Sequence, residues 1–258
     1  MAGNTSQPGA TVVSRTVALL AAFDASHPRL TLTALADRAG LPLPTAHRLV
    51  GELARLGVLA RTPSGHYVVG RRLWQIGLLA PVQTDLRETA APFLQDLYAT
   101  TLATVHLAVR DGTGVLYLDR LSGQRSVPVL SRTGARLALH ATGVGKVLLA
   151  YAPPDVQQKI LSSLKRITPY TVTSPAQLRA QLDRVLADGY ATTAEEMTLG
   201  ACSVAVPVQR GSDVIAALGT VVPSLRRDKG RLVSALQVAA HGIGRSAHNS
   251  QEPGQVRQ

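Results

Sequence analysis

Cysteine is almost absent from this chain of 258 residues, in which Cys202 is the single example. One cysteine excludes an internal disulfide framework and a cysteine-based zinc module. We expect the protein to work in a reducing compartment, the cytoplasm. Aromatic residues make up only 3% of the chain, so its 45% apolar content must build a core from Leu, Val and Ala. That apolar content excludes a disordered chain.

Acidic residues and long apolar runs are also scarce. Asp and Glu number 16 against 27 Lys and Arg, which gives a formal net charge of +11. This balance favours a polyanionic partner, with nucleic acid ahead of an anionic membrane surface. The most apolar stretch, 214–223, is about half as long as a membrane-spanning helix. We therefore expect no membrane segment, and the N-terminus does not have the pattern of a signal peptide.

Three short helices are predicted at the start of the chain. The first has apolar residues at helical spacing and ends before His27. Thr33 can cap the second helix, and Gly40 ends it because glycine readily takes the left-handed conformation that follows a helix. Pro44 opens the third helix from its first position, and Gly57 closes it.

A β-hairpin is predicted directly after these helices. Its strands cover 58–61 and 66–69, around the turn Thr62-Pro63-Ser64-Gly65. Two helices, a turn, a third helix and a hairpin is the order of a winged helix-turn-helix. A generic three-helix interaction domain is the alternative, but the turn chemistry and the basic charge favour DNA binding.

The third helix would be the recognition helix, whose N-terminal residues reach base edges in the major groove. The candidates for contact there are Thr45, His47 and Arg48. Arg48 would bind guanine or clamp a phosphate, and a solvated helix face is the alternative interpretation. The hairpin candidates for backbone or minor-groove contact are Arg61, Ser64 and His66.

The rest of the chain alternates helices and strands. A helical connector that Pro81 stops precedes a longer helix, in which Pro92 makes a kink or marks the true start. The further predicted elements are hairpins over 104–121 and 204–222, a strand over 126–131, and helices after Thr142, after Ser174 and around 232–243. Hairpins with helices inserted between them indicate an α+β sheet domain and not a doubly wound one.

Small residues, Gly143-Val144-Gly145, follow the predicted cap Thr142. Free N–H groups and the helix dipole favour an anion at such a helix start, for example a carboxylate. Plain helix–sheet packing, with glycine allowing close approach, is the alternative. A phosphate-binding loop is excluded, because His140 and Val147 stand where that loop needs glycine and Ser or Thr. Lys146 is therefore expected to be a structural or surface lysine.

We predict no catalytic residues, no metal site and no cofactor. Glu195 and Glu196 are neighbours on an extended segment, where they would point to opposite faces and cannot form an acid–base pair. Four potential metal ligands lack ligand spacing, and core or surface roles explain them more simply: His106, His140, His241 and Cys202.

A series of short motifs carries a resemblance to a known family. They are ALADRAGL (34–41), PTAHRLV (44–50), LARLGVL (53–59), YVVGRRLWQIG (67–77), HATGVGKVLLA (140–150), GYATTAEEMTLG (189–200) and AVP (205–207). By their order and spacing the chain resembles the IclR family of bacterial transcription regulators over about residues 12–245.

The resemblance implies an α+β protein with an N-terminal winged helix-turn-helix domain, a linker helix and a C-terminal GAF-like effector-binding domain. The expected ranges are 10–71, 72–84 and 85–248, with a disordered leader over 1–9 and a disordered tail over 249–258. Family members are dimers, often tetramers, that bind operator DNA with an affinity that a small metabolite changes. The implied partners are therefore double-stranded operator DNA, a small-molecule effector and further copies of the chain.

The resemblance also implies an effector pocket lined by Gly143 and Val144. It carries the rest of the pocket onto Val129, Thr193, Ala201, Ser203, Gly219 and Val221. Ser203 takes the place of a common cysteine, and the later strand offers glycine and valine, which implies a roomier and less polar pocket. We expect an acidic effector that is less polar than a two-carbon oxo-acid. Two alternatives are an enzyme on a GAF-like domain, which would not need the winged helix, and an architectural DNA-binding protein, which would not need the pocket.

Overall fold

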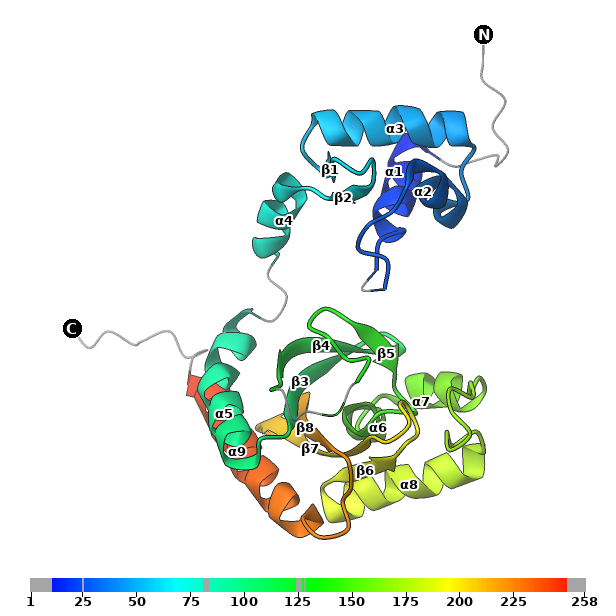
Figure 1. Ribbon diagram of the computed structural model, residues 1–258. Coiled ribbons are helices and arrows are strands. Elements are labelled where there is room, and N and C mark those ends of the chain that lie inside the picture. The colour runs from blue at the N-terminus through cyan, green and yellow to red at the C-terminus, as the bar shows by residue number, and fades with distance from the viewer. Residues whose placement is uncertain (1–10, 25, 81–83, 124–126, 128, 250–258) are drawn as a thin grey trace, which may run out of the picture. The chain divides into compact units, whose positions relative to one another are not determined.

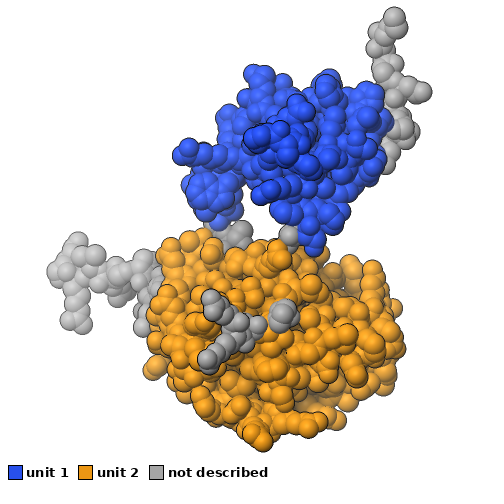
Figure 2. Space-filling view, in the orientation of Figure 1, with its two compact units in different colours: residues 1–81 blue, residues 82–258 orange. Residues whose placement is uncertain are grey.

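The computed structural model describes residues 11–24, 26–80, 84–123, 127 and 129–249. The chain divides into two compact units, residues 1–81 and 82–258 (Figure 2). The first unit has a single apolar core, and the second has one on each face of its sheet. Among the described residues, no helix combines the length and apolar character needed to cross a membrane.

The first unit is a winged helix-turn-helix. Its elements in chain order are α1 (Val12–Ala21), α2 (Leu32–Ala39), α3 (Leu43–Arg55), β1 (Leu59–Arg61), β2 (Tyr67–Val69) and α4 (Arg71–Leu78) (Figure 1). Strands β1 and β2 pair antiparallel, and a bridge from Leu30 to Tyr67 fastens the start of α2 to this hairpin. The three helices pack together in the core through buried leucines, one from each helix: Leu19, Leu35 and Leu49. The predicted order of elements is confirmed.

Local sequence determines the helix ends in this unit, with two corrections. The prediction that Thr33 caps α2 is wrong: Thr31 is the cap, and its Oγ1 accepts the N–H of Ala34 at 3.2 Å. The pairing of Leu30 with the hairpin holds the chain extended up to that residue, and the helix begins directly after it, with Thr31 as the cap. Gly40 ends α2 with φ +64°, as predicted. Helix α3 begins one residue before Pro44, at Leu43.

The second unit is a six-stranded antiparallel sheet with helices on both faces. The strand order is β5-β4-β3-β8-β7-β6. The strands are β3 (Thr104–Asp111), β4 (Gly114–Leu121), β5 (Arg136–Ala138), β6 (Ala191–Ala194), β7 (Cys202–Arg210) and β8 (Asp213–Val222). The helices are α5 (Thr84–Thr101), α6 (Gly143–Ala150), α7 (Pro154–Leu161), α8 (Pro175–Asp188) and α9 (Lys229–Asn249). The predicted α+β class is confirmed.

Successive side chains of each strand point to opposite faces of the sheet, so the core of this unit has two layers. On β3, Val105 and Leu107 pack with α5 and α9, whereas Ala108 packs with α6 and α8 on the opposite face. Figure 1 shows α5 and α9 side by side on the first face. Small residues let α6 approach the second face closely, since a Cβ on Gly219 would lie only 2.9 Å from Val144 Cγ1.

Some expected elements of this unit differ from the structure. The strand predicted over 126–131 lies partly outside the described residues, and the described residues there, 127 and 129–131, are not in a strand. The strand at this edge is instead β5, where Leu137 pairs with Val115. Pro92 lies inside α5, so it does not mark the start of that helix. The short strand β6 and helix α7 have weak sequence signals and were not predicted.

Candidate functional site

Helix α3 presents the residues predicted to read DNA near its N-terminus. His47 and Arg48 are exposed, and Thr45 is half-buried. The opposite face of the helix is buried in the core of the first unit through Leu49, Val50 and other apolar residues. Contact of the exposed side chains with DNA remains a prediction.

The predicted wing is the β1–β2 hairpin, and hydrogen bonds organise its turn. Thr62 Oγ1 lies 2.9 Å from Ser64 Oγ, which in turn lies 3.2 Å from His66 Nδ1. The guanidinium of Arg61 lies 5.9 Å from the centre of the Tyr67 ring. The three wing candidates therefore belong to one small, ordered hairpin, in which Arg61 and Ser64 are exposed and His66 is half-buried.

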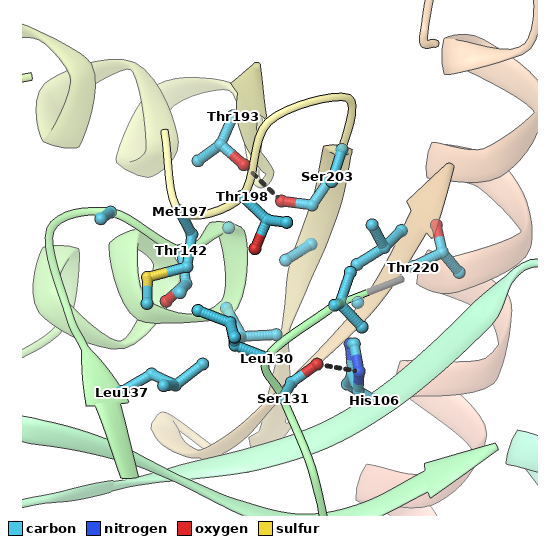
Figure 3. Close-up of a pocket in the computed structure, with 18 of the residues that line it drawn as sticks. His106, Leu130, Ser131, Leu137, Thr142, Thr193, Met197, Thr198, Ser203 and Thr220 are labelled. Atoms are coloured by element: carbon cyan, nitrogen blue, oxygen red, sulfur yellow. Dashed lines mark hydrogen bonds between the residues drawn. The ribbon is translucent and has the colours of Figure 1, made fainter. Parts of the chain in front are cut away.

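The second unit has a cavity between the sheet and the start of α6 (Figure 3). All of the residues assigned to an effector pocket line it: Val129, Gly143, Val144, Thr193, Ala201, Ser203, Gly219 and Val221. They come from the α6 N-terminus, strands β6, β7 and β8, the loop before β7 and the segment before β5. A mostly apolar cavity on which a few polar groups converge is typical of a small-molecule site.

The start of α6 offers backbone donors to this cavity. Thr142 caps the helix, because its Oγ1 accepts the N–H of Gly145 at 3.1 Å and its carbonyl accepts the N–H of Lys146 at 2.9 Å. The first two N–H groups, of Gly143 and Val144, have no acceptor within the helix. Together with the helix dipole they favour a negative group at this point of the wall.

The glycine at the start of α6 also has a packing role. A Cβ on Gly143 would lie 2.5 Å from Ser203 Oγ and 3.5 Å from the Ala205 Cβ. A residue with a Cβ at this position would force the Ser203 hydroxyl to move. Close packing, which the sequence left as the alternative to an anion site, is therefore present at the same residue that lines the cavity.

Two hydrogen-bonded pairs are among the polar side chains of the cavity, whose lining also includes Tyr117, Thr142, Thr198 and Thr220. The Thr193 and Ser203 hydroxyls lie 2.6 Å apart on β6 and β7, and His106 Nε2 lies 2.8 Å from Ser131 Oγ. Strand β8 separates β7 from β3, so the two pairs stand at different ends of the cavity (Figure 3). Burial, with the nearby charge of Arg120, lowers the pKa of His106 to about 3, so the imidazole is neutral. None of the described lining residues is Lys, Arg, Asp or Glu.

The remaining chemical candidates of the sequence do not form a catalytic or metal site. Among the described residues, no group of three or more His, Cys, Asp or Glu could hold a metal ion. His140 donates from Nε2 to the Lys165 carbonyl at 2.9 Å, which is a structural contact. Lys146 is 1% exposed, so of the two expected roles the structural one is correct. Glu196 pairs with it, and Glu195 accepts the N–H of Gly200 instead of forming a carboxylate pair.

Known family models match both units of the chain. The model of the bacterial transcriptional regulator IclR C-terminal domain matches residues 80–245, and that of the IclR helix-turn-helix domain matches residues 12–63. The chain belongs to the IclR family. It is therefore a transcription regulator with a DNA-binding helix-turn-helix domain, and not an enzyme.

Individual relatives agree with this IclR assignment. The HTH-type transcriptional regulator XynR of Escherichia coli strain K12 is 32% identical over 241 residues, 91% of this chain and 96% of XynR. The p-hydroxybenzoate hydroxylase transcriptional activator of Acinetobacter baylyi is 33% identical over 203 residues, 76% of this chain and 74% of the activator. A crystal structure of an IclR homolog from Microbacterium hydrocarbonoxydans, complexed with 4-hydroxybenzoate, is 34% identical. It superposes with a TM-score of 0.87 and covers 93% of this chain and 100% of that one.

Several residues that line the cavity of this IclR-family protein were not predicted from the sequence. They are His106, Tyr117, Leu130, Ser131, Leu137, Met197 and Thr198, among others. One signal was available: His106 alternates with Val105 and Leu107 along a predicted strand, which places it on the sheet face opposite to theirs. The His106 and Tyr117 rings meet edge to face with 5.1 Å between centroids, across the paired strands β3 and β4.

Proposed function

We propose that this IclR-family regulator binds operator DNA with an affinity that changes when a small acidic effector occupies the cavity of its second unit. The observation that carries the proposal is the convergence of all the assigned pocket positions on one cavity at the start of α6. An architectural DNA-binding protein would not need such a cavity.

The chemistry of the lining indicates the class of effector. The N–H groups of Gly143 and Val144, with the Ser203 hydroxyl beside them, can donate to a carboxylate. Apolar side chains such as Leu137 and Val221 form much of the remaining wall, and neutral His106 with Ser131 offers a polar contact on a different strand. This arrangement suits a monocarboxylic acid with an apolar body and a second polar group. The ligand of the Microbacterium homologue, 4-hydroxybenzoate, has these features and is the first probe to use.

DNA recognition is assigned to the first unit. We propose that Thr45, His47 and Arg48 approach the major groove and that Arg61, Ser64 and His66 contact the backbone or the minor groove. Binding should weaken steeply with salt, since Lys and Arg side chains release counterions from the DNA. A regulator of this kind works in the cytoplasm, which agrees with the single cysteine.

A homodimer is the proposed minimum assembly, with a tetramer as the larger form. Exposed apolar side chains on α1, on α4 and at the C-cap of α4 support an interface between copies: Val13 at 72%, Val17 at 57%, Trp74 at 59%, Ile76 at 55% and Leu79 at 82% exposed. Large apolar side chains at this exposure mark interaction surfaces when they cluster. Two copies would read two half-sites of a palindromic operator.

A thermal-shift screen tests the effector proposal. Full-length protein is melted with aromatic and aliphatic carboxylic acids, starting with 4-hydroxybenzoate. A ligand at about 100 times its dissociation constant adds about 2.7 kcal/mol to the free energy of unfolding, which raises the melting temperature measurably. Stabilisation by monocarboxylic acids but not by their amides supports the acid site. Stabilisation by acid and amide alike contradicts it.

A further inference from the structure

A lysine is buried inside the effector unit and bonded to a carboxylate. Lys146 Nζ, on α6, donates to Glu196 Oε1 at 2.5 Å and to Gln181 Oε1, on α8, at 2.7 Å. The side chains of Lys146 and Glu196 are only 2% and 7% exposed. The second carboxylate oxygen, Glu196 Oε2, is buried without a hydrogen-bond partner among the described residues.

A buried ion pair contributes little net free energy to the stability of a protein. Two charges lose their hydration on burial, and the free energy of their attraction seldom exceeds that loss. Apolar side chains of similar volume would therefore stabilise the fold equally well. Burial opposes the charge of Lys146 and lowers its pKa, although Glu196 acts in the other direction. A buried ion pair with short, directional hydrogen bonds does fix the relative position of the segments that carry it.

The segment that the pair fixes is the loop 195–201 between β6 and β7. Buried hydroxyl groups also bind the backbone of this loop. Thr168 Oγ1 donates to the Glu195 carbonyl and Thr171 Oγ1 donates to the Glu196 carbonyl, each at 2.7 Å. Glu195 has φ +57°, an uncommon conformation for a residue other than glycine, which such contacts must maintain.

The loop forms one wall of the cavity, and α6 forms another. Met197, Thr198 and Ala201 line the cavity from the loop, as Figure 3 shows for the first two, and Gly143 and Val144 line it from the start of α6. Lys146 lies on α6 three residues after Gly143 and two after Val144. A single ion pair therefore joins the two walls.

We propose that Lys146 and Glu196 are positioning residues, which latch the loop 195–201 to α6 and hold Met197 and Thr198 over the cavity. The consequence for effector binding rests on the function proposed above. The consequence for the loop does not, so it can be measured on the protein without a ligand.

Cys202 provides the measurement. It is the single cysteine of the chain, it is half-buried, and it occupies the first position of β7 directly after the loop, paired with Ala194 of β6. The rate at which a neutral disulfide reagent, 4,4′-dithiodipyridine, modifies this half-buried thiol in the folded full-length protein rises when the loop opens more often.

Replacing the lysine should release the latch. We expect Lys146→Met to react about tenfold faster than the wild-type protein, because local opening becomes more frequent. Lys159→Met removes an exposed lysine from α7 and should leave the rate unchanged. Leu236→Ala truncates a fully buried side chain on α9, beyond the opposite face of the sheet, and controls for general loss of stability. The two variants are compared at an equal fall in melting temperature. If the modification rate then rises no more in Lys146→Met than in Leu236→Ala, the proposal is overturned.

Two further variants keep the test decisive. If Lys146→Met does not fold, Glu196→Gln retains an acceptor for Lys146 and should accelerate modification about threefold, through loss of charge assistance alone. Lys146→Met/Glu196→Met replaces the ion pair by apolar side chains and should recover the melting temperature while modification stays fast. A wild-type rate in Glu196→Gln or in the double variant would contradict a directional latch.

Effector binding provides a second, independent test of the latch. Where 4-hydroxybenzoate binds the wild-type protein, Lys146→Met should bind it about tenfold more weakly, because the loop must be ordered at the moment of binding. An unchanged affinity would overturn the role of the latch in binding. If the wild-type protein binds none of the carboxylic acids of the thermal-shift screen, the proposed effector class fails, while the thiol measurement still decides whether the latch exists.

Discussion

Ser203 stands directly against Gly143, so that a Cβ on the glycine would lie 2.5 Å from the serine Oγ. The first turn of α6 and strand β7 approach so closely at this contact that a methyl group would displace the serine hydroxyl. The same two residues carry donor groups that we propose bind the acid of the effector. Close packing and anion binding are therefore compatible interpretations of the glycine, and they describe two properties of one contact.

Gly143→Ala should lower the free energy of unfolding by about 1–3 kcal/mol, because the added methyl overpacks this contact. Ser203→Ala removes the clashing oxygen, so Gly143→Ala in a Ser203→Ala background should cost less. Urea unfolding of the parent, both single variants and the double variant measures the coupling between the two sites. Strictly additive effects would show that the two residues do not compete for the same space.

Arg48→Ala should weaken operator binding by about 1–3 kcal/mol with an unchanged melting temperature, because an exposed side chain that contacts a base or phosphate is lost. Arg55→Ala is the matched control on the same helix, since its guanidinium already donates to Glu52 at 3.1 and 2.6 Å. Fluorescence anisotropy titrations of both variants at one salt concentration decide the matter. Equal effects of the two substitutions would remove Arg48 from the interface.

Ile76→Glu should dissociate the proposed dimer, because it introduces a charge into an exposed apolar side chain of α4 that we assign to the interface. The dissociation constant of the dimer should rise by about 10–100-fold, and operator binding should weaken with it. Gln75→Glu adds the same charge at the neighbouring exposed position and should change neither. Light scattering over a concentration series provides the measurement, and dimers of equal strength in both variants would contradict the assignment.

Stability should fall in mild acid because of His106. Burial and the neighbouring Arg120 lower the pKa of this imidazole to about 3 in the folded chain. An unfolded histidine titrates near 6.5, so below about pH 6.5 the unfolded chain binds a proton that the folded chain does not. The loss approaches about 1.4 kcal/mol per pH unit, or about 2 kcal/mol between pH 7 and pH 5.

Urea unfolding at several pH values tests this titration. His106→Gln should lose less stability than the wild-type protein between pH 7 and pH 5, because glutamine does not titrate. His47→Gln, at an exposed position of α3, should behave like the wild-type protein. Parallel pH dependence in wild-type and His106→Gln proteins would show that the buried imidazole is not the cause.

Local chemistry made much of the fold predictable. Thr142 and Ser174 cap their helices through side-chain oxygens, and Gly40 and Gly189 end theirs at φ +64° and +76°. Each of these signals lies within a few residues of the element that it limits. Where a distant pairing decided the boundary, as Leu30 with Tyr67 does for α2, the local signal misplaced the helix start by two residues.

The site depended more on long-range contacts, and the sequence predicted less of it. The resemblance to a family supplied the assigned lining positions, and these do converge on one cavity. The Lys146–Glu196 bond joins residues 50 positions apart, and the His106–Ser131 bond joins residues 25 apart. Neither pairing has a local pattern, because only the folded sheet brings the partners together.

A single titration tests the central claim, that an acid in the cavity changes operator affinity. An operator duplex is first selected from random sequences with the full-length protein, and its binding is then followed by fluorescence anisotropy at fixed salt, with and without saturating 4-hydroxybenzoate. A melting-temperature shift in the same sample establishes that the ligand is bound. We expect the operator dissociation constant to change by about fivefold or more, the usual size of coupling between two sites. An identical dissociation constant with the ligand bound would contradict the account.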